Sequence, residues 1–477
     1  MTILIGQNSG RSIVLLKQIA SSGEGTVWKT NAPGLLAKLY HDCTPERVAK
    51  LKTMVAHPPP DPMPDRQHVS LAWPQDSLMD RQGQVLGFVM PEIGESVKLS
   101  TIYNPKLRSR KAPRFNWYYL HTAAFNIAST LDAIHSQGYV VGDIKPQNIL
   151  VNSQALTSII DTDSFQIKDP DSDHIFRCLV GSEGFTPVEL LGKDLGTVDQ
   201  TNIHDRFRLA VIIYLLLFGD QPFKGKWIGR GDSPQPTELI QKGYWPYAPQ
   251  SLIRPGPHTI LLSVVHPQLQ ACFHQCFSQG HSQPHLRPTA RQWMFALKQA
   301  IATLQTCNLE ANHHFSQSYG HCYWCDRKAR LGVDIFSPNP VIAKPRSRRP
   351  AVQDAASRQK HPASARLKHR STTNYQQRIH QLKAMAVPPQ GSSRALFPPG
   401  WSQQVRWPQL SNSALGLILC TVGCLGLALL LAPELSSSSL SSWSQSLDRV
   451  LENWFFSKLG QQPQAPTSQL LSRQPRP

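Results

Sequence analysis

Three polar residues in two short segments could carry out chemistry on a phosphate. Asp143 and Asn148 lie five positions apart in VGDIKPQNIL, and Asp161 comes thirteen positions later in IIDTDSF. Their neighbours are apolar, so we expect the first two on a loop and the third at the end of a buried strand. Carboxylate and amide oxygens are ligands that Mg²⁺ accepts while it keeps phosphates and waters. The spacing therefore predicts two metal ligands beside a carboxylate base.

A turn of small residues further upstream could approach phosphate oxygens. The β-like run 13–19 (IVLLKQI) leads into residues 20–27 (ASSGEGTV), and a second β-like run, 35–40 (LLAKLY), follows. Small residues let backbone N–H groups come close to a phosphate, and Lys38 on the second run could neutralise its charge. An ordinary glycine-rich hairpin beside a solvated lysine would show the same pattern, so the turn alone leaves both interpretations open.

Together these segments resemble the eukaryotic-like protein kinases. In that family a glycine-rich loop, a strand lysine, a catalytic loop and a metal-binding segment follow one another in this order. The resemblance covers residues 11–305 and implies an α+β fold of two lobes. The motif DTDSFQ at residues 161–166, together with GEGTVW, is most similar to a bacterial branch of kinase-like proteins.

Three later segments extend the resemblance. The sequence GFTPVEL is similar to the end of an activation segment, HDRF to the start of a buried helix, and LRPTA to a late helix. The resemblance implies that Asp205 braces the catalytic loop and that Arg287 pairs with Glu189.

The resemblance also implies a role for each polar residue of the site. Lys38 would hold the α- and β-phosphates of ATP, Asp143 would orient or deprotonate the substrate hydroxyl, and Lys145 would steady the γ-phosphate. Asn148 and Asp161 would hold Mg²⁺. The implied function is transfer of the γ-phosphate to Ser or Thr hydroxyls of a protein substrate. The residues expected around the nucleotide are Ser22, Gly23, Gly25, Val27, Lys38, Met90 and Glu92.

Several positions depart from the family pattern. Val141-Gly142 stand where the family has His-Arg, so phosphorylation of the activation segment would find no arginine there. Thr162-Asp163 replace Phe-Gly and put an extra carboxylate beside the metal site. Glu46 follows Lys38 by eight residues, which is closer than the usual acidic partner. A kinase-like scaffold without activity is therefore the alternative to an active enzyme.

A cluster of cysteine and histidine residues occupies residues 306–330. A C-x-x-C pair can place two thiolates on one ion, and a further cysteine and a histidine would complete a tetrahedral zinc site. Four such residues within nineteen positions favour a zinc knuckle over unrelated reduced thiols. The predicted ligands are Cys307, His313, Cys322 and Cys325, with His314 and His321 as competitors for the histidine position.

The net charge of +18 is concentrated in one segment of the 477-residue chain. Residues 341–410 hold thirteen Lys or Arg and a single acid, Asp354. Residues 335–412 are also rich in Pro, Ser and Gln and show no sustained periodicity, which predicts a disordered basic linker. Its aromatic residues are too sparse to form stacking platforms, so nucleic-acid binding is the weakest of the functions considered.

Residues 414–432 are nineteen positions without a charge. As a helix they would span about 28 Å, close to the ~30 Å of a bilayer core, which predicts one transmembrane helix. More Lys and Arg precede this span than follow it, so we expect the kinase-like domain in the cytoplasm. The apolar run 209–218 is too short to cross and predicts a buried helix.

The segments around the predicted span suggest two further contacts. Small residues recur every four positions along it, which would allow a homodimer, although chance gives the same pattern in an apolar segment. The tail, residues 433–477, contains a short amphipathic helix that would lie on the membrane or pack against a partner. No secretory leader opens the chain, so we expect its N-terminal part to be cytosolic and reduced.

Overall fold

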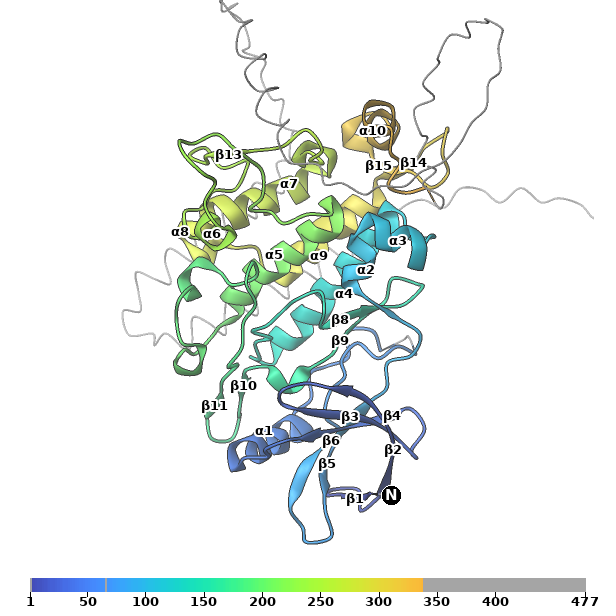
Figure 1. Ribbon diagram of the computed structural model, residues 1–477, viewed down its shortest axis with the longest axis vertical. Helices are drawn as coiled ribbons and strands as arrows, with labels where there is room; N and C mark the ends of the chain where they lie inside the picture. The colour runs from blue at the N-terminus through green and yellow to red at the C-terminus, as the bar shows by residue number, and fades with distance from the viewer. Residues whose placement is uncertain (1, 65–66, 338–477) are drawn as a thin grey trace, which may run out of the picture. The chain divides into compact units, whose positions relative to one another are not determined.

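Strands dominate the N-terminal part of the computed structural model, which describes residues 2–64 and 67–337. Six strands close into an antiparallel barrel in the order β1-β2-β3-β4-β6-β5 (blue in Figure 1). This barrel is the small lobe. Its strands are β1 (Ile3–Gly6), β2 (Ser12–Ser21), β3 (Gly25–Thr30), β4 (Leu35–Tyr40), β5 (Asp76–Met79) and β6 (Val85–Pro91).

The interior of the barrel is filled from alternate strand positions. Ile13 and Leu15 of β2 point inward, as the period of two in a strand requires. They join a small core completed by Leu4, Ala37, Leu78 and Val89. Because β1 pairs with both β2 and β5, the domain begins before residue 11, the boundary expected from the sequence. The structure also places β3 between the two runs that were expected to be joined by one turn.

One helix, α1 (Pro45–Ala56), crosses the small lobe. The hydroxyl of Thr44 accepts the backbone N–H of Arg47 and caps its first turn. The other end is tied to the large lobe, since the indole N–H of Trp73 donates to the carbonyl of Met54 at 2.8 Å. Met54 of α1 therefore belongs to the apolar core of the large lobe.

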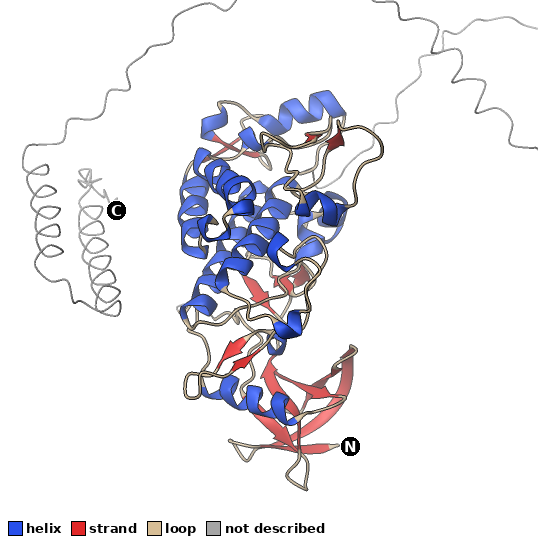
Figure 2. Ribbon diagram, turned by 90° about the vertical axis from the view of Figure 1, so that its left-hand side faces the viewer, coloured by secondary structure: helices blue, strands red, loops and turns tan. Residues whose placement is uncertain are grey.

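Helices form most of the large lobe, beyond the strand-rich end that carries the N-terminus (Figure 2). Helix α4 (Trp117–Ser136) lies against α5 (Asn202–Phe218) and α9 (Ala290–Ala302) around one apolar core. A three-stranded sheet in the order β7-β8-β9 lies beside α4 and carries the segments of the predicted site. The remaining helices are α2 (Leu99–Tyr103), α3 (Pro105–Lys111), α6 (Pro236–Gln241), α7 (Pro267–His274) and α8 (Gly280–Ser282), and the remaining strands of the lobe are β7 (Val97–Lys98), β8 (Ile149–Val151), β9 (Thr157–Ile159), β10 (Ile167–Lys168), β11 (Ile175–Phe176), β12 (Lys226–Trp227) and β13 (Ile253–Arg254).

The apolar run 209–218 is a buried helix, as the sequence predicted. It forms the second half of α5, and all ten of its side chains are buried. Gly219 ends the helix at φ 73°, a left-handed conformation that glycine adopts without the penalty of a Cβ.

A short hairpin and a helix close the described chain. Strand β14 (Leu304–Thr306) pairs with β15 (His314–Ser316), and α10 (Tyr323–Leu331) follows. Trp324 of α10 packs edge-on against Trp117 of α4, with ring centroids 5.0 Å apart. This terminal module, residues 304–336, shares the apolar core of the large lobe, so the boundary expected at 305–306 does not separate two cores.

Within residues 2–64 and 67–337, the structure contains no helix of the length and apolar character that membrane crossing requires. The predicted transmembrane helix at 414–432 and the predicted tail lie outside the described residues. The predicted linker, 335–412, lies outside them except for its first three residues.

Candidate active site and metal centre

The lysine of β4 reaches the predicted metal-binding segment. Nζ of Lys38 lies 2.8 Å from Oδ1 of Asp161 and 2.7 Å from Oδ1 of Asp163. Burial opposes the lysine charge, but attraction to Asp163 and Asp161 outweighs it, so the pKa of Lys38 lies above its ordinary value. The fold thus brings together two predicted residues that are 123 positions apart.

The loop before β8 holds the predicted catalytic carboxylate. Asp143 is buried, and its Oδ1 accepts a hydrogen bond of 2.7 Å from the hydroxyl of Ser182. Its Oδ2 pairs with the ammonium group of Lys145. Both oxygens are therefore oriented by donors, and Lys145 lies beside the carboxylate as the sequence predicted.

The predicted magnesium ligands lie on neighbouring segments. The main-chain carbonyl of Asn148 accepts the N–H of Ile160, the residue before Asp161, at 2.9 Å. Asp161 has φ 63°, a left-handed conformation that costs a non-glycine residue about 1–3 kcal/mol and is typical of functional sites. Carboxylate oxygens of Glu24, Asp161 and Asp163 lie within 4.8 Å of one another. The side-chain amide of Asn148 donates to the main-chain carbonyl of Asp143 at 3.5 Å. The three carboxylates form an oxygen donor set that fits Mg²⁺.

The buried carboxylate of Asp205 accepts hydrogen bonds from the backbone of the catalytic loop. The N–H groups of Val141 and Gly142 donate to the two oxygens of Asp205 at 2.7 and 3.0 Å. Burial would raise the pKa of Asp205, but hydrogen bonds and charge from His135 and Arg208 lower it, so the carboxylate stays ionised. This geometry confirms the bracing role expected for Asp205.

The loop between β2 and β3 lies over Lys38. Oε2 of Glu24 is 4.0 Å from the lysine Nζ. A Cβ at Gly25 would lie 2.2 Å from the carbonyl oxygen of Leu39, so close approach of β3 to β4 already requires this glycine. Ser22 and Gly23, by contrast, are exposed in the turn.

The other residues expected around the nucleotide lie on the strands behind this loop. Val27 faces Lys38 across β3 and β4, and Met90 of β6 pairs with Leu36. Glu92 follows β6, and its carboxylate pairs with Lys29. These predicted nucleotide residues therefore lie on or directly after neighbouring strands of the small lobe, and Glu92 is already paired with a lysine.

The sequence of this chain is similar to those of known protein kinases. Residues 85–295 match the family described as "Protein kinase domain". Two relatives named "Protein kinase YegI", from Escherichia coli strain K12 and strain O157:H7, are each 32% identical to this chain, over 68% and 66% of its length. The chain belongs to the protein kinase superfamily. It spans about half the length of these relatives, 50% and 49% respectively.

Other protein kinases are similar over shorter stretches. A "Probable cAMP-dependent protein kinase catalytic subunit" from Encephalitozoon cuniculi is 32% identical over 24% of this chain and 33% of that protein. A solved structure titled "ROP18 kinase domain in complex with AMP-PNP and sucrose" is 16% identical, with a TM-score of 0.41, over 63% of this chain and 84% of that one.

The end of the activation segment is tied to the large lobe. Both oxygens of Glu189 accept hydrogen bonds from the guanidinium group of Arg287, at 2.5 and 2.8 Å. The Arg287 side chain has no exposed surface. The pairing expected from the sequence is confirmed.

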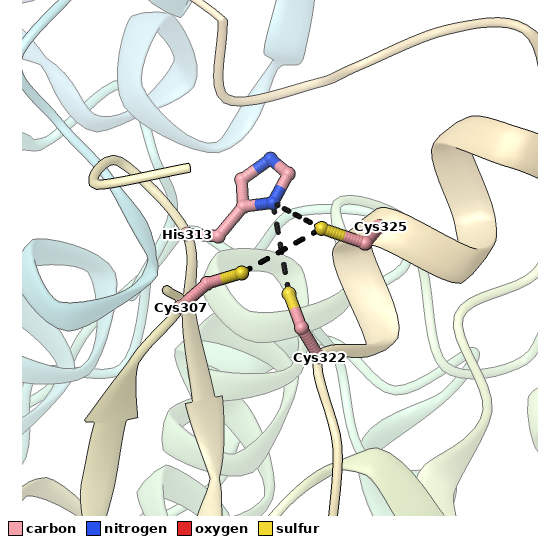
Figure 3. Close-up of side chains that lie close together, drawn as sticks. All are labelled: Cys307, His313, Cys322 and Cys325. Atoms are coloured by element: carbon pink, nitrogen blue, oxygen red, sulfur yellow. Dashed lines mark hydrogen bonds between the residues drawn. The ribbon is translucent and has the colours of Figure 1, made fainter. Parts of the chain in front are cut away.

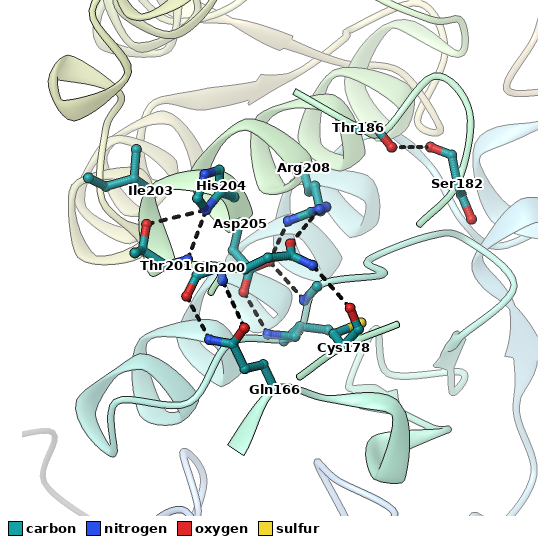
Figure 4. A network of polar contacts seen from close by, with 12 residues as sticks. Gln166, Cys178, Ser182, Thr186, Gln200, Thr201, Ile203, His204, Asp205 and Arg208 are labelled. Carbon is teal, nitrogen blue, oxygen red and sulfur yellow. Dashed lines mark hydrogen bonds and ion pairs between the residues drawn. The ribbon is translucent and has the colours of Figure 1, made fainter. Parts of the chain in front are cut away.

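Side-chain amides tie the start of the same segment, at Gln166, to residues that follow the segment (Figure 4). The side-chain amide of Gln166 donates to the carbonyl of Gln200 at 2.6 Å and accepts its N–H at 2.8 Å. The side chain of Gln200 accepts from Arg208 at 2.8 Å, and Arg208 also pairs with Asp205 at 3.1 Å. The activation segment is thus connected to the carboxylate that braces the catalytic loop.

Gly142, where the kinase family has arginine, is adjacent to this network. It has φ 76°, and a Cβ there would lie 2.5 Å from the sulfur of the buried Cys178. A side chain at position 142 would therefore meet both backbone strain and a packed thiol. In the kinase family an arginine at this position can pair with a phosphate on the activation segment. Here Cys178 of the activation segment packs against Gly142 instead.

The four residues predicted to bind zinc converge between β14, β15 and α10 (Figure 3). Nδ1 of His313 lies 3.5 Å from the sulfur of Cys325 and 3.6 Å from that of Cys322. The sulfurs of Cys307 and Cys325 are 3.6 Å apart. A tetrahedral zinc ion with bonds of about 2.0–2.3 Å separates its ligands by roughly 3.5–3.8 Å, so these spacings fit the metal.

The competing histidines face elsewhere. His314 contacts the hydroxyl of Thr306 at 3.4 Å, and His321 pairs with Asp326 at 2.7 Å. The other ring nitrogen of His313, Nε2, lies 3.0 Å from a carboxylate oxygen of Asp334. Such a carboxylate fixes the ring so that Nδ1 faces the metal side.

Sequence reasoning missed three residues that the structure adds to these sites: Ser182, Tyr40 and Asp334. The acid two positions after Asp161 was noted, but not as a partner of Lys38. Asp334 could have been suspected as an acid close to the last cysteine. For Ser182 and Tyr40 the sequence offered no signal, because only the folded chain brings them to Asp143 and Asp163.

Proposed function

We propose that this protein is an ATP-dependent protein kinase that transfers the γ-phosphate to Ser or Thr hydroxyls of a protein. The observation that most directly supports this proposal is the contact between Lys38 and Asp161. The buried Asp143 carboxylate, oriented by Lys145, supplies the second part of the site. Phosphoryl transfer relies mainly on positioning and charge neutralisation, which this set of residues can supply. Assignment to the bacterial branch with the DTDSFQ motif is part of this proposal.

Each side chain has a defined task in the proposed reaction. Lys38 binds the α- and β-phosphates, and Asn148 with Asp161 holds Mg²⁺, which neutralises phosphate charge when bound. Asp143 orients the acceptor hydroxyl and receives its proton. Ser182 supports this role, because its own hydroxyl already donates to the Asp143 carboxylate at 2.7 Å.

Phosphate transfer from labelled Mg-ATP tests the proposal. We expect the full chain to label itself or an added protein, and Asp143→Ala to abolish the signal. Asp171→Asn, which alters an exposed acid on the β10–β11 loop, is the matched control and should retain it. If no protein tried is labelled by the wild type, the chain is a scaffold, with or without bound nucleotide.

We also propose that Cys307, His313, Cys322 and Cys325 bind one zinc ion. Support comes from their ligand spacing and from the Asp334 carboxylate behind His313. The purified chain should contain about one zinc per molecule, and Cys322→Ser should lose it. Cys43→Ser, a cysteine outside the cluster, should keep the metal. Wild-type protein that is purified without metal, and that melts at the same temperature as wild-type protein supplied with zinc, would refute the site.

The membrane anchor stays part of the proposed function. The uncharged run 414–432 supports a single crossing with the kinase domain on the cytoplasmic side. The full chain should sediment with membranes and resist extraction by high salt, whereas the double variant Leu419→Arg/Leu425→Arg should be released. A wild-type chain that high salt releases would contradict the anchor. Pairing of two copies through this span is a further prediction.

A further inference from the structure

The two carboxylates within hydrogen-bond distance of Lys38 differ in burial. The Asp163 side chain is 3% exposed and that of Asp161 is 41% exposed. A buried ion pair is screened less by water and salt than an exposed one. Asp163 is therefore the partner that holds the lysine most firmly.

Helix α1 does not supply an acid to this lysine. Its single acidic residue, Glu46, is exposed in the first turn. One turn further on, Lys50 points at the same cluster and donates to the main-chain carbonyl of Asp163 at 2.7 Å. Where a protein kinase is expected to present a glutamate from this helix, the helix presents a lysine.

The carboxylate of Asp163 is fixed on both sides. One oxygen accepts from Lys38, and the other accepts from the hydroxyl of Tyr40 at 2.9 Å. Burial, followed by the charge of Asp163, raises the pKa of Tyr40, so the phenol keeps the proton that it donates. The carboxylate and the lysine thus form one buried unit that includes β4 and the metal-binding segment.

We propose that Asp163 is the positioning residue that aims Lys38 at the nucleotide phosphates, in place of an acid on helix α1. This inference rests on the proposed kinase function. Asp163 lies two positions after the metal ligand Asp161, so one segment positions both the phosphate-binding lysine and the metal. Helix α1 contacts this pair through the Lys50 hydrogen bond to the main-chain carbonyl of Asp163 and contributes no acid to it. Disorder of residues 161–163 would remove the lysine partner and the metal ligand together.

Charge removal at position 163 tests this inference. Asp163→Asn keeps the shape and an acceptor for Tyr40 but loses the charge. We expect the Kd for Mg-ADP and the KM for ATP to rise by about 10-fold or more, since hydrogen bonds to charged groups contribute roughly 1.5–3 kcal/mol. Asp163→Glu should recover part of the loss. Glu46→Gln, the matched change on α1, should stay within about twofold of wild type for an exposed side chain.

The outcomes separate this inference from the proposed function. Calorimetry measures nucleotide binding, and labelling measures phosphate transfer. A wild type that binds Mg-ADP but transfers no phosphate would refute only the kinase activity. The comparison of Kd values would still decide the role of Asp163. Tyr40→Phe loosens the carboxylate without removing charge and should give a smaller rise in Kd. A folded Asp163→Asn that binds Mg-ADP as wild type does, or a Glu46→Gln that weakens binding as much, overturns the inference.

Discussion

Ser182 of the activation segment donates its hydroxyl hydrogen bond to Oδ1 of Asp143 at 2.7 Å. Lys145 pairs with the other oxygen of the same carboxylate. The orientation of Asp143 is therefore set by one residue of its own loop and one residue 39 positions later. The position of the activation segment and the orientation of the proposed base, Asp143, are therefore coupled through Ser182.

Loss of the Ser182 hydroxyl should slow the chemical step. We expect Ser182→Ala to lower kcat by about 10-fold or more, because a hydrogen bond to a charged group contributes roughly 1.5–3 kcal/mol. The KM for ATP should change little, since Lys38 and its partners are untouched. Ser182→Thr keeps the hydroxyl and is the control. Equal kcat values for the alanine and threonine variants would show that this contact does not align Asp143.

The amide network predicts activity without phosphorylation of the activation segment. Gln166, Gln200 and Arg208 hold the segment through hydrogen bonds, and Gly142 offers no side chain to a phosphate. Protein treated with a phosphatase should therefore keep its rate within about twofold, because no charge is needed to order the segment. Phosphate content is measured by mass spectrometry before and after. A large fall in rate after complete dephosphorylation would contradict the prediction.

Removal of the Gln200 side-chain amide, unlike dephosphorylation, should lower both stability and activity. Gln200→Leu leaves the buried Arg208 without one of its acceptors and should cost about 1–3 kcal/mol of unfolding free energy. Activity should fall with it, because Arg208 also contacts the Asp205 brace. Gln154→Leu, on an exposed turn, is the control and should change neither quantity.

The resemblance to the protein kinases predicted the two-lobed fold, and local patterns predicted the buried helix of run 209–218 and the residues at short spacing. Each of these features lies within one short stretch of sequence: the apolar run that forms the second half of α5, the loop of Asp143 and Asn148, and the zinc ligands. The partner of Lys38 could not be predicted, because it depends on which of several acids the folded chain buries: Glu46 stays exposed and Asp163 does not. Strand β1 was missed because its four residues carry too little alternation to identify it.

The Glu189–Arg287 pair predicts a pH-dependent contribution to stability. Burial raises the pKa of Glu189, but the hydrogen bonds and charge of Arg287 outweigh this and hold it below its ordinary value of 4.5. The unfolded chain therefore takes up the proton first, and the stabilisation, fully present above pH 4.5, is lost as the pH falls through the folded pKa. Glu189→Gln should cost about 3 kcal/mol at pH 7, since Arg287 keeps an uncompensated buried charge.

Urea unfolding of the two proteins at several pH values measures this effect. The gap in unfolding free energy between wild type and Glu189→Gln should narrow as the pH falls below 4.5. Asp132→Asn, which removes a more exposed partner of Arg291 at 3.2 Å, should cost less than about 1 kcal/mol at any pH. A gap that stays constant down to the acid transition would mean that the Arg287 pair does not contribute through its charge.

A buried histidine predicts a second loss of stability in mild acid. His121 of α4 has almost no exposed surface, and its Nδ1 lies 2.8 Å from the carbonyl of Trp117, to which the neutral ring donates. Burial lowers the pKa of His121 from 6.5 to about 4. Between these values the unfolded chain binds a proton that the folded chain does not, so stability falls as the pH drops from 6.5 towards 4.

At 1.36 kcal/mol per pKa unit, protonation linked to His121 should lower the free energy of unfolding by about 3 kcal/mol between pH 6.5 and pH 4. His121→Asn keeps a donor near Nδ1 and cannot titrate, so its unfolding free energy should fall less steeply from pH 7 to pH 5 than that of the wild type. His285→Asn replaces an exposed histidine and should follow the wild-type curve. Parallel curves for His121→Asn and wild type would place the acid sensitivity in other groups, because only a neutral, buried imidazole at position 121 makes the two slopes differ.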